Sequence, residues 1–132
     1  MNPAWADRLG GVASLMCAVH CLVMAFAPVV LTVTGLGIFA HEAFEWVFFG
    51  CALGFAGIAA VAALVDRRPV WVLGGFALGI PLLMLGRAAE ALSLFEGGGW
   101  LAIAAGLLLA GTHIANLQTL ARLRAAEAER VG

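Results

Sequence analysis

The chain has 132 residues, of which 64% are hydrophobic and only 11% are charged, and its formal net charge is −1. Water-soluble domains carry about 25% charged residues, so this composition excludes an ordinary soluble globule. It also excludes a disordered chain, which needs low hydrophobicity and high charge, and a nucleic-acid binder, which needs clustered basic side chains.

Four uncharged blocks divide the chain, and each is close to the length that crosses a bilayer: residues 9–41, 46–65, 69–86 and 97–121. A hydrocarbon core of about 30 Å needs about 20 apolar residues in helical conformation. The blocks lack the alternating pattern of barrel strands, so helices are predicted. We therefore expect one all-α domain over residues 1–132, a polytopic four-transmembrane-helix bundle with helices at about 9–34, 43–65, 70–92 and 98–121.

The first apolar segment is expected to stay in the protein. Arg8, the apolar run after it and Ala25-Phe26-Ala27 resemble a signal peptide with its cleavage site. Pro28 in the next position disfavours cleavage, and the apolar run continues beyond it. Pro28 and Pro81 are expected to kink the first and third helices.

The first segment also carries three soft metal ligands, Cys17, His20 and Cys21, within one helical turn. At about 100° per residue, one helix face of about 100° holds all three. This set suits a thiophilic ion: Hg(II) with two sulfurs, Cu(I) with two or three, or Zn(II) with mixed sulfur and nitrogen ligands. A disulfide between the two cysteines is an alternative, but their Cβ vectors are poorly aimed on an intact helix, so only a minor oxidised form is expected.

The second segment follows an acidic stretch with His41, Glu42 and Glu45. Acidic side chains raise the local concentration of cations, which makes Glu42 a secondary metal-site candidate. The alternative is that acidic residues gather where Arg is excluded. Cys51 is expected to be a small apolar packing residue, and it is a secondary candidate as a ligand.

Small residues should mediate packing between the helices, because helices in lipid gain no hydrophobic drive from meeting each other. Gly50-x-x-x-Gly54 in the second segment and Gly75-x-x-x-Gly79 in the third fit this expectation, as do Gly106 and Gly111 in the fourth.

The fourth segment carries a polar patch of Thr112, His113 and Asn116. Counting about 1.5 Å per residue from the expected helix ends places His113 and Cys17 at similar depth. His113 is therefore a candidate metal ligand and Asn116 a secondary candidate. The alternative is that both form hydrogen bonds between helices.

Arg residues predict the orientation, because positive charge is retained on the cytoplasmic side. Six of the seven fall before the first segment, between the second and third, or after the fourth, and Arg87 is the exception. Both termini are therefore expected in the cytoplasm.

A set of short motifs runs through the chain: Asp7-Arg8-Leu9-Gly10, Ala13-Ser14, Cys17-Ala18-Val19-His20-Cys21, Pro28, Glu42-Ala43-Phe44 and His113-x-x-Asn116. Together they resemble the MerC-type domain of bacterial inner-membrane mercuric-ion transport proteins, over nearly the whole chain. The resemblance implies a multi-pass inner-membrane protein that takes Hg(II) from the outer side by thiolate exchange, with Cys17 and Cys21 as the matches to the paired cysteines of the family. A cysteine pair near the C-terminus of some members is missing, and Glu45 stands where relatives often have His, so Zn(II) and copper remain open.

The ligand pattern and the family resemblance both predict uptake of a thiophilic metal ion. Catalysis is not expected, because no nucleotide motif, Ser/His/Asp arrangement or paired carboxylate marks an enzyme. The expected partners of the protein are the metal ion, the lipid bilayer, a periplasmic metal donor and a cytosolic thiol acceptor, with a homo-oligomer left open and neither a permanently bound cofactor nor nucleic acid. Two alternative functions are also considered for these residues. One is a haem-binding membrane redox protein that uses His20 and His113, and the other is a structural or regulatory subunit without a ligand.

Overall fold

The computed structural model describes residues 4–26, 33–35, 37, 41–94 and 97–131, and this part of the chain contains helices and no strand. The helices are α1 (Ala4–Phe26), α3 (Glu42–Val65), α4 (Val70–Ala91) and α5 (Gly98–Val131). All 4 are long and apolar enough to cross a membrane. The predicted all-α architecture with four membrane-spanning helices is confirmed.

The ends of α3 and α4 and the start of α5 agree with the prediction within one residue, whereas both ends of α1 and the end of α5 differ. α1 begins at Ala4 because the Asp7 carboxylate finds hydrogen-bond partners inside the bundle and does not end the helix. The described helix ends at Phe26, so the expected kink at Pro28 lies outside the described residues. Pro81 lies inside α4, which is helical from Val70 to Ala91.

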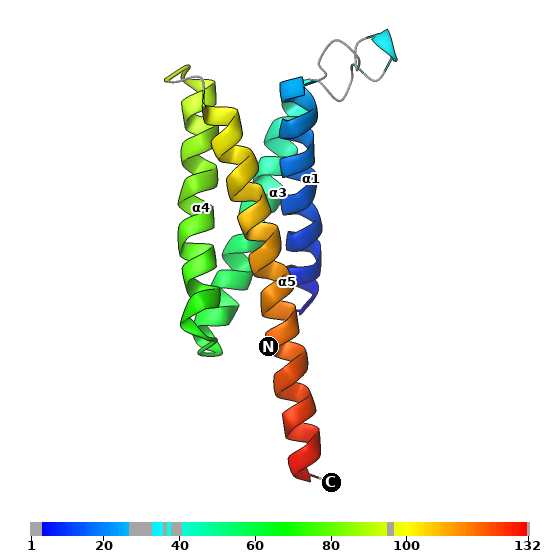
Figure 1. Ribbon diagram of the computed structural model, residues 1–132, viewed down its shortest axis with the longest axis vertical. Helices are drawn as coiled ribbons and strands as arrows, with labels where there is room; N and C mark the ends of the chain where they lie inside the picture. Colours follow the sequence, from blue (N-terminus) through cyan, green and yellow to red (C-terminus); the bar gives the residue numbers. More distant parts are fainter. Residues whose placement is uncertain (1–3, 27–32, 36, 38–40, 95–96, 132) are drawn as a thin grey trace.

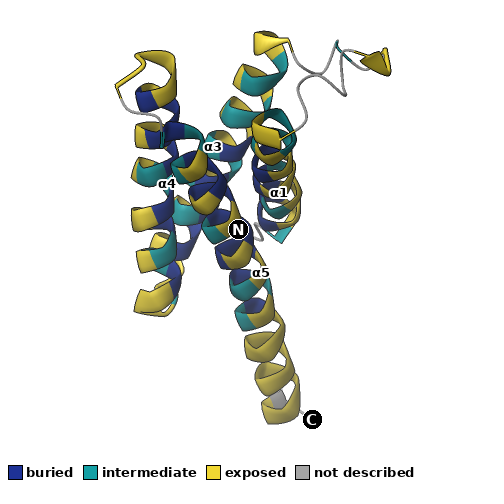
Figure 2. Cartoon of the chain, turned by 45° about the horizontal axis from the view of Figure 1, so that its top comes forward, coloured by how far each residue is buried: buried dark blue, intermediate teal, exposed yellow. Residues whose placement is uncertain are grey.

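α5 has 34 residues because its Ala-, Glu- and Arg-rich end also forms helix. At about 1.5 Å per residue it is about 50 Å long, which exceeds the hydrocarbon core of a bilayer. Its last turns extend beyond the other helices and are exposed to solvent (Figures 1 and 2).

The helices form a bundle in which α5 packs along α1 and α4, and α3 packs against α1 (Figure 1). The start of α1, the turn at Asp66 and the exposed end of α5 lie at one end, which we name the Asp66 end. The start of α3 lies at the other, which we name the Glu45 end. Six Arg residues belong to segments at the Asp66 end, as the sequence predicts, and the side of the membrane that this end faces stays a prediction.

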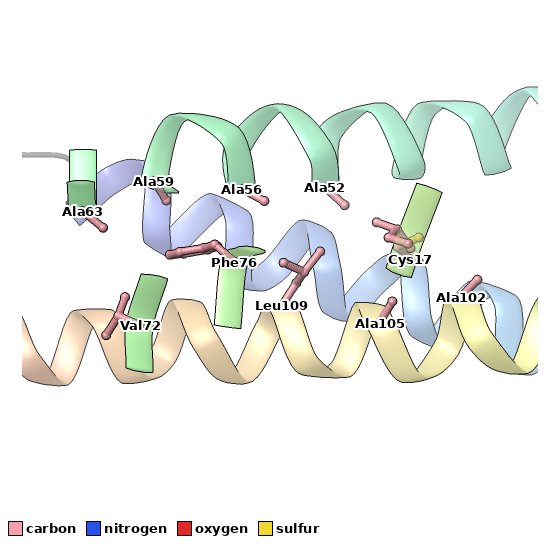
Figure 3. Close-up of a cluster of buried hydrophobic side chains, with 11 residues drawn as sticks. Cys17, Ala52, Ala56, Ala59, Ala63, Val72, Phe76, Ala102, Ala105 and Leu109 are labelled. Carbon is pink, nitrogen blue, oxygen red and sulfur yellow. The ribbon is translucent and has the colours of Figure 1, made fainter. Parts of the chain in front are cut away.

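The core is built mainly from small side chains, which let the helix backbones approach closely. α3 contributes a buried row of alanines, and Phe76 of α4 and Leu109 of α5 lie in the same buried cluster (Figure 3); the row is Ala52, Ala56, Ala59 and Ala63. Most of the buried positions in this core are therefore alanines, with a few larger side chains between them.

The predicted glycine contacts are found in α4 but not in α3. A Cβ at Gly79 would lie 2.6 Å from Leu109 Cδ2, and one at Gly75 would overlap the side chain of Thr112. No described atom lies within 4 Å of a Cβ built at Gly50 or Gly54. Gly50 and Gly54 of α3 therefore face away from the described helices, whereas Gly75 and Gly79 of α4 allow side chains of α5 to approach closely.

Candidate metal site

Cys17, His20 and Cys21 lie together at a small cavity in the half of the bundle nearer the Glu45 end. The cavity is about 10 Å³, the space of roughly one water molecule, and is therefore of a size for a single ion. All four helices line it: Cys17, His20 and Cys21 from α1, Glu45, Phe48 and Phe49 from α3, Leu83 and Arg87 from α4, and Ala102 from α5.

Cys17 is 4% exposed and belongs to the buried core, where it lies beside Ala52 and Ala105 (Figure 3). Cys21 follows one helical turn later and is half-buried. The two sulfurs are neighbours, and both cysteines are free thiols. The spacing of four residues on one helix therefore produces a pair of adjacent sulfur ligands in apolar surroundings.

His20 forms one wall of the cavity. Its ring lies 5.3 Å from the ring of Phe48, centroid to centroid, at an interplanar angle of 51°. Its Nε2 atom is buried and has no hydrogen-bond partner among the described residues. A nitrogen donor is therefore present beside the two thiols.

Arg87 brings a positive charge to the same cavity. It is only 9% exposed, and its Nη2 and Nη1 atoms lie 2.7 Å from Glu45 Oε2 and 2.9 Å from Glu90 Oε2. Its guanidinium carbon lies 5.0 Å from the centroid of the Trp46 ring. In the sequence, Arg87 is only the exception to the distribution of Arg residues that predicts the orientation. Its separation from the other six Arg residues was a signal that its charge is paired with carboxylates at the cavity.

The remaining acidic and cysteine candidates lie outside the cavity. Glu42 is exposed and accepts a hydrogen bond from Trp46 Nε1 at 3.0 Å. His41 caps α3 by accepting a hydrogen bond from the Ala43 amide at 3.2 Å. Cys51 is exposed on α3. Of the acidic stretch, Glu45 is the residue that reaches the cavity.

His113 and Asn116 belong to a second cluster, centred on Asp7. The Asp7 carboxylate lies 3.0 Å from His113 Nδ1 through Oδ1 and accepts a 2.8 Å hydrogen bond from Asn116 Nδ2 through Oδ2. None of the three side chains is more than 1% exposed. The sequence interpretation missed Asp7, because a charged residue near the start of a predicted helix is normally solvated.

The expectation that His113 and Cys17 share a depth is wrong. The His113 ring packs against Gly10, where a Cβ would overlap it. Gly10 and Cys17 are separated by seven residues of helix, or about 10 Å along the axis. The estimate failed because it assumed that α1 begins at Leu9, whereas α1 begins at Ala4.

The soft donors at the cavity are two thiols and one imidazole nitrogen. Within the described ranges, no group of three or more His, Cys, Asp or Glu side chains is placed to hold a metal ion. Thiolate sulfur is the ligand type that thiophilic ions select.

Comparison with known proteins adds a family to this geometry. A family model described as MerC mercury resistance protein matches residues 7–118, which is most of the chain. No curated protein and no solved structure matches the chain. The matched range includes both the cavity and the cluster around Asp7.

Proposed function

The chain belongs to the family of MerC mercury resistance proteins, and from this premise we propose that it carries Hg(II) across the bacterial inner membrane by ligand exchange at Cys17 and Cys21. The family suggests mercuric ion transport, and the helices make the chain a multi-pass membrane protein. One observation carries the finer proposal: two adjacent free thiols line an ion-sized cavity inside the bundle.

The chemistry follows from the charge of the bound ion. Each thiol loses its proton when its sulfur binds the metal. Two thiolates and one Hg(II) form a complex with no net charge, which avoids the large cost of placing a bare divalent ion in apolar surroundings. His20 Nε2 lies at the same cavity as a further donor during exchange.

The direction of transport follows from the two ends of the bundle. Glu42, Glu45 and Glu90 gather near the Glu45 end, where their charges raise the local cation concentration on the proposed periplasmic side. The Asp66 end, with six Arg residues, faces the cytoplasm in this scheme. A periplasmic donor would deliver the ion, and a cytosolic thiol would remove it from the cysteine pair.

The test is an anaerobic titration of the purified chain with HgCl₂, followed by the absorption of the mercury–thiolate bond. We expect one Hg(II) per chain in the wild type, none in the Cys17→Ser/Cys21→Ser double variant, and unchanged binding in Cys51→Ser, because Cys51 lies outside the cavity. Unchanged binding in the double variant would overturn the proposal.

Transport is measured on vesicles that contain the reconstituted protein and an entrapped thiol. Uptake of labelled Hg(II) should require both Cys17 and Cys21. Competition with Zn(II) and Cu(I) in the same assay identifies the preferred ion, and tighter binding of either would replace Hg(II) in the proposal.

The haem alternative has little support in the geometry. His20 lies at a cavity of about 10 Å³, far smaller than a porphyrin, and His113 lies in the separate cluster around Asp7. A visible haem band in the purified protein would revive this alternative, and a ligand-free subunit would show no metal binding in the titration.

A further inference from the structure

A groove of about 450 Å³ runs between α3 and α4 in the half of the bundle nearer the Asp66 end. On α3 its lining extends from Ala60 to Leu64, on α4 it extends from Leu73 to Pro81, and every lining side chain is apolar. Because Val61 and Leu64 are largely exposed, the groove opens on the outer surface of the bundle. It is separate from the cavity that the two thiols line.

The length and the lining of the groove fit one acyl chain of a lipid. α3 and α4 are long and apolar enough to cross a membrane, so the surroundings of the groove are hydrocarbon. From Leu73 to Pro81 the axis of α4 rises about 12 Å, which is close to about 15 Å, half the thickness of the hydrocarbon core. The groove therefore extends from the membrane interface to near the middle of the bilayer, as an acyl chain of one leaflet does.

The interfacial end of the groove carries positive charge. The turn that joins α3 to α4 contains Asp66, Arg67 and Arg68, so its charged side chains sum to one positive charge. This turn is attached directly to the groove, because the Arg67 amide donates a hydrogen bond of 3.2 Å to the carbonyl of Leu64, a lining residue. Basic groups at the interfacial end of a site between membrane helices match the headgroup of an anionic lipid.

Both arginines of the turn keep donors that no described protein group uses. Arg67 is exposed, and the ion pairs among the described residues do not include it. Arg68 Nη2 lies 3.1 Å from Asp66 Oδ2, whereas Arg68 Nη1 has no hydrogen-bond partner among the described residues, although the side chain is only 8% exposed. Guanidinium groups form strong, charge-assisted hydrogen bonds with phosphate. The turn thus offers both charge and donors to one phosphate group.

From this arrangement we propose that the groove between α3 and α4 binds one anionic phospholipid, with an acyl chain between the helices and the headgroup phosphate at the turn with Arg67 and Arg68. A phosphodiester carries one negative charge and so neutralises the excess positive charge of the turn. A zwitterionic lipid has the same phosphate but adds a cationic group beside it, which the two arginines repel. The site is independent of the proposed metal transport.

A helix from a second copy of the chain is the alternative occupant, and charge disfavours it. Two copies in one membrane have the same orientation, so the second copy would bring its own basic turn to the same end of the groove. Like charges at this short separation repel each other, and the free donors of Arg67 and Arg68 would gain no acceptor. A lipid phosphate supplies both the opposite charge and the acceptor oxygens.

The test compares two lipids with identical acyl chains, phosphatidylglycerol and phosphatidylcholine, added to the purified full chain in a mild non-ionic detergent. Native mass spectrometry counts the bound lipids, and the melting temperature is recorded against lipid concentration, because a ligand of the folded state raises it. We expect one phosphatidylglycerol per chain, bound at least about fivefold more tightly than phosphatidylcholine, the preference that one basic residue provides. Arg67→Gln should remove this preference, and Arg130→Gln, exposed in the last turn of α5, should keep it.

A second pair of variants tests the acyl part of the site. Ala77 lines the groove and is exposed, so Ala77→Phe fills the groove without disturbing the core. It should abolish the rise in melting temperature with either lipid. Ala104→Phe adds the same ring at an exposed position of α5 outside the groove, and it should bind lipid as the wild type does.

Three results overturn the inference: equal affinity of the wild type for the two lipids, unchanged lipid binding in Ala77→Phe, or a dimer that Ala77→Phe dissociates and phosphatidylglycerol does not. Inorganic phosphate alone should leave the melting temperature unchanged, and a rise equal to that with phosphatidylglycerol also overturns it. The Cys17→Ser/Cys21→Ser variant should bind the lipid normally, so the lipid site and the metal site are tested separately.

Discussion

Arg87 Nη2 lies 2.7 Å from Glu45 Oε2, and this ion pair joins α4 to α3 at the cavity that the two thiols line. Glu45 is thus the residue of the acidic stretch that reaches the candidate metal site. The pair holds two helices at a fixed separation beside Cys17 and Cys21. Its removal should affect the stability of the bundle and the geometry of the site together.

Glu45→Gln should destabilise the bundle, because it leaves the nearly buried Arg87 with its weaker, more exposed partner Glu90. Breaking a fully buried ion pair costs about 3–5 kcal/mol, and the partial exposure of Glu45 reduces this to about 1–2 kcal/mol. Thermal unfolding in detergent measures the change. Glu42→Gln is the matched control, because Glu42 is exposed on the same helix turn, and an equal effect of both variants contradicts the prediction.

Gly10→Ala should destabilise the packing of α1 on α5, because the added Cβ overlaps the ring of His113. Overpacking of this kind costs about 1–3 kcal/mol. In Gly54→Ala the added Cβ meets nothing within 4 Å, so this control should keep or slightly raise the melting temperature, since Ala favours helix. Equal melting temperatures for the two variants would show that Gly10 is not in close contact with His113.

Asp7→Asn should lower stability by about 1–3 kcal/mol, because the carboxylate is buried and accepts hydrogen bonds from two side chains of α5. Asp66→Asn removes a carboxylate that is partly exposed in its pair with Arg68, and it should cost at most about 1 kcal/mol. The melting temperatures of both variants are compared in the same detergent. A larger loss for Asp66→Asn contradicts the assignment of Asp7 to the interior.

The orientation of the bundle is tested by labelling single cysteines in a variant without native cysteines. Ala128→Cys, in the exposed part of α5, should react with a membrane-impermeant maleimide only from the cytoplasmic side. Ala43→Cys, exposed at the start of α3, should react only from the periplasmic side. Labelling of both cysteines from the same side would refute the predicted topology, and labelling of each from the opposite side would reverse the predicted orientation.

The sequence predicted the helices well because charges are scarce and separate the apolar blocks. α3 ends at Val65, next to Asp66, and α4 begins at Val70, directly after Arg67, Arg68 and Pro69, as this charged turn predicts. The start of α1 could not be predicted from local pattern, because the burial of Asp7 depends on two side chains more than 100 residues away. Local pattern carries no information on such long-range pairing.

The part of the candidate site that depends on local helix geometry was also predictable from the sequence. Cys17, His20 and Cys21 share a turn, so helix geometry alone brings them together. Arg87 and Glu45 lie beside these three residues only because of the way α3 and α4 pack. His113 lies away from them because α5 is shifted along α1. The relative shift of two helices is set by close contacts such as that of Gly10, which the sequence pattern does not specify.

The size of the cavity restricts the form in which the proposed ion can reach the thiols. A space of about 10 Å³ holds about one water-sized particle, whereas an ion that still carries two bulky thiol ligands is far larger. If Cys17 and Cys21 receive Hg(II) as proposed, its earlier ligands must leave one at a time as each protein sulfur replaces one of them. Under the proposed function, an ion that exchanges its ligands slowly would then be excluded even when the bare ion is small.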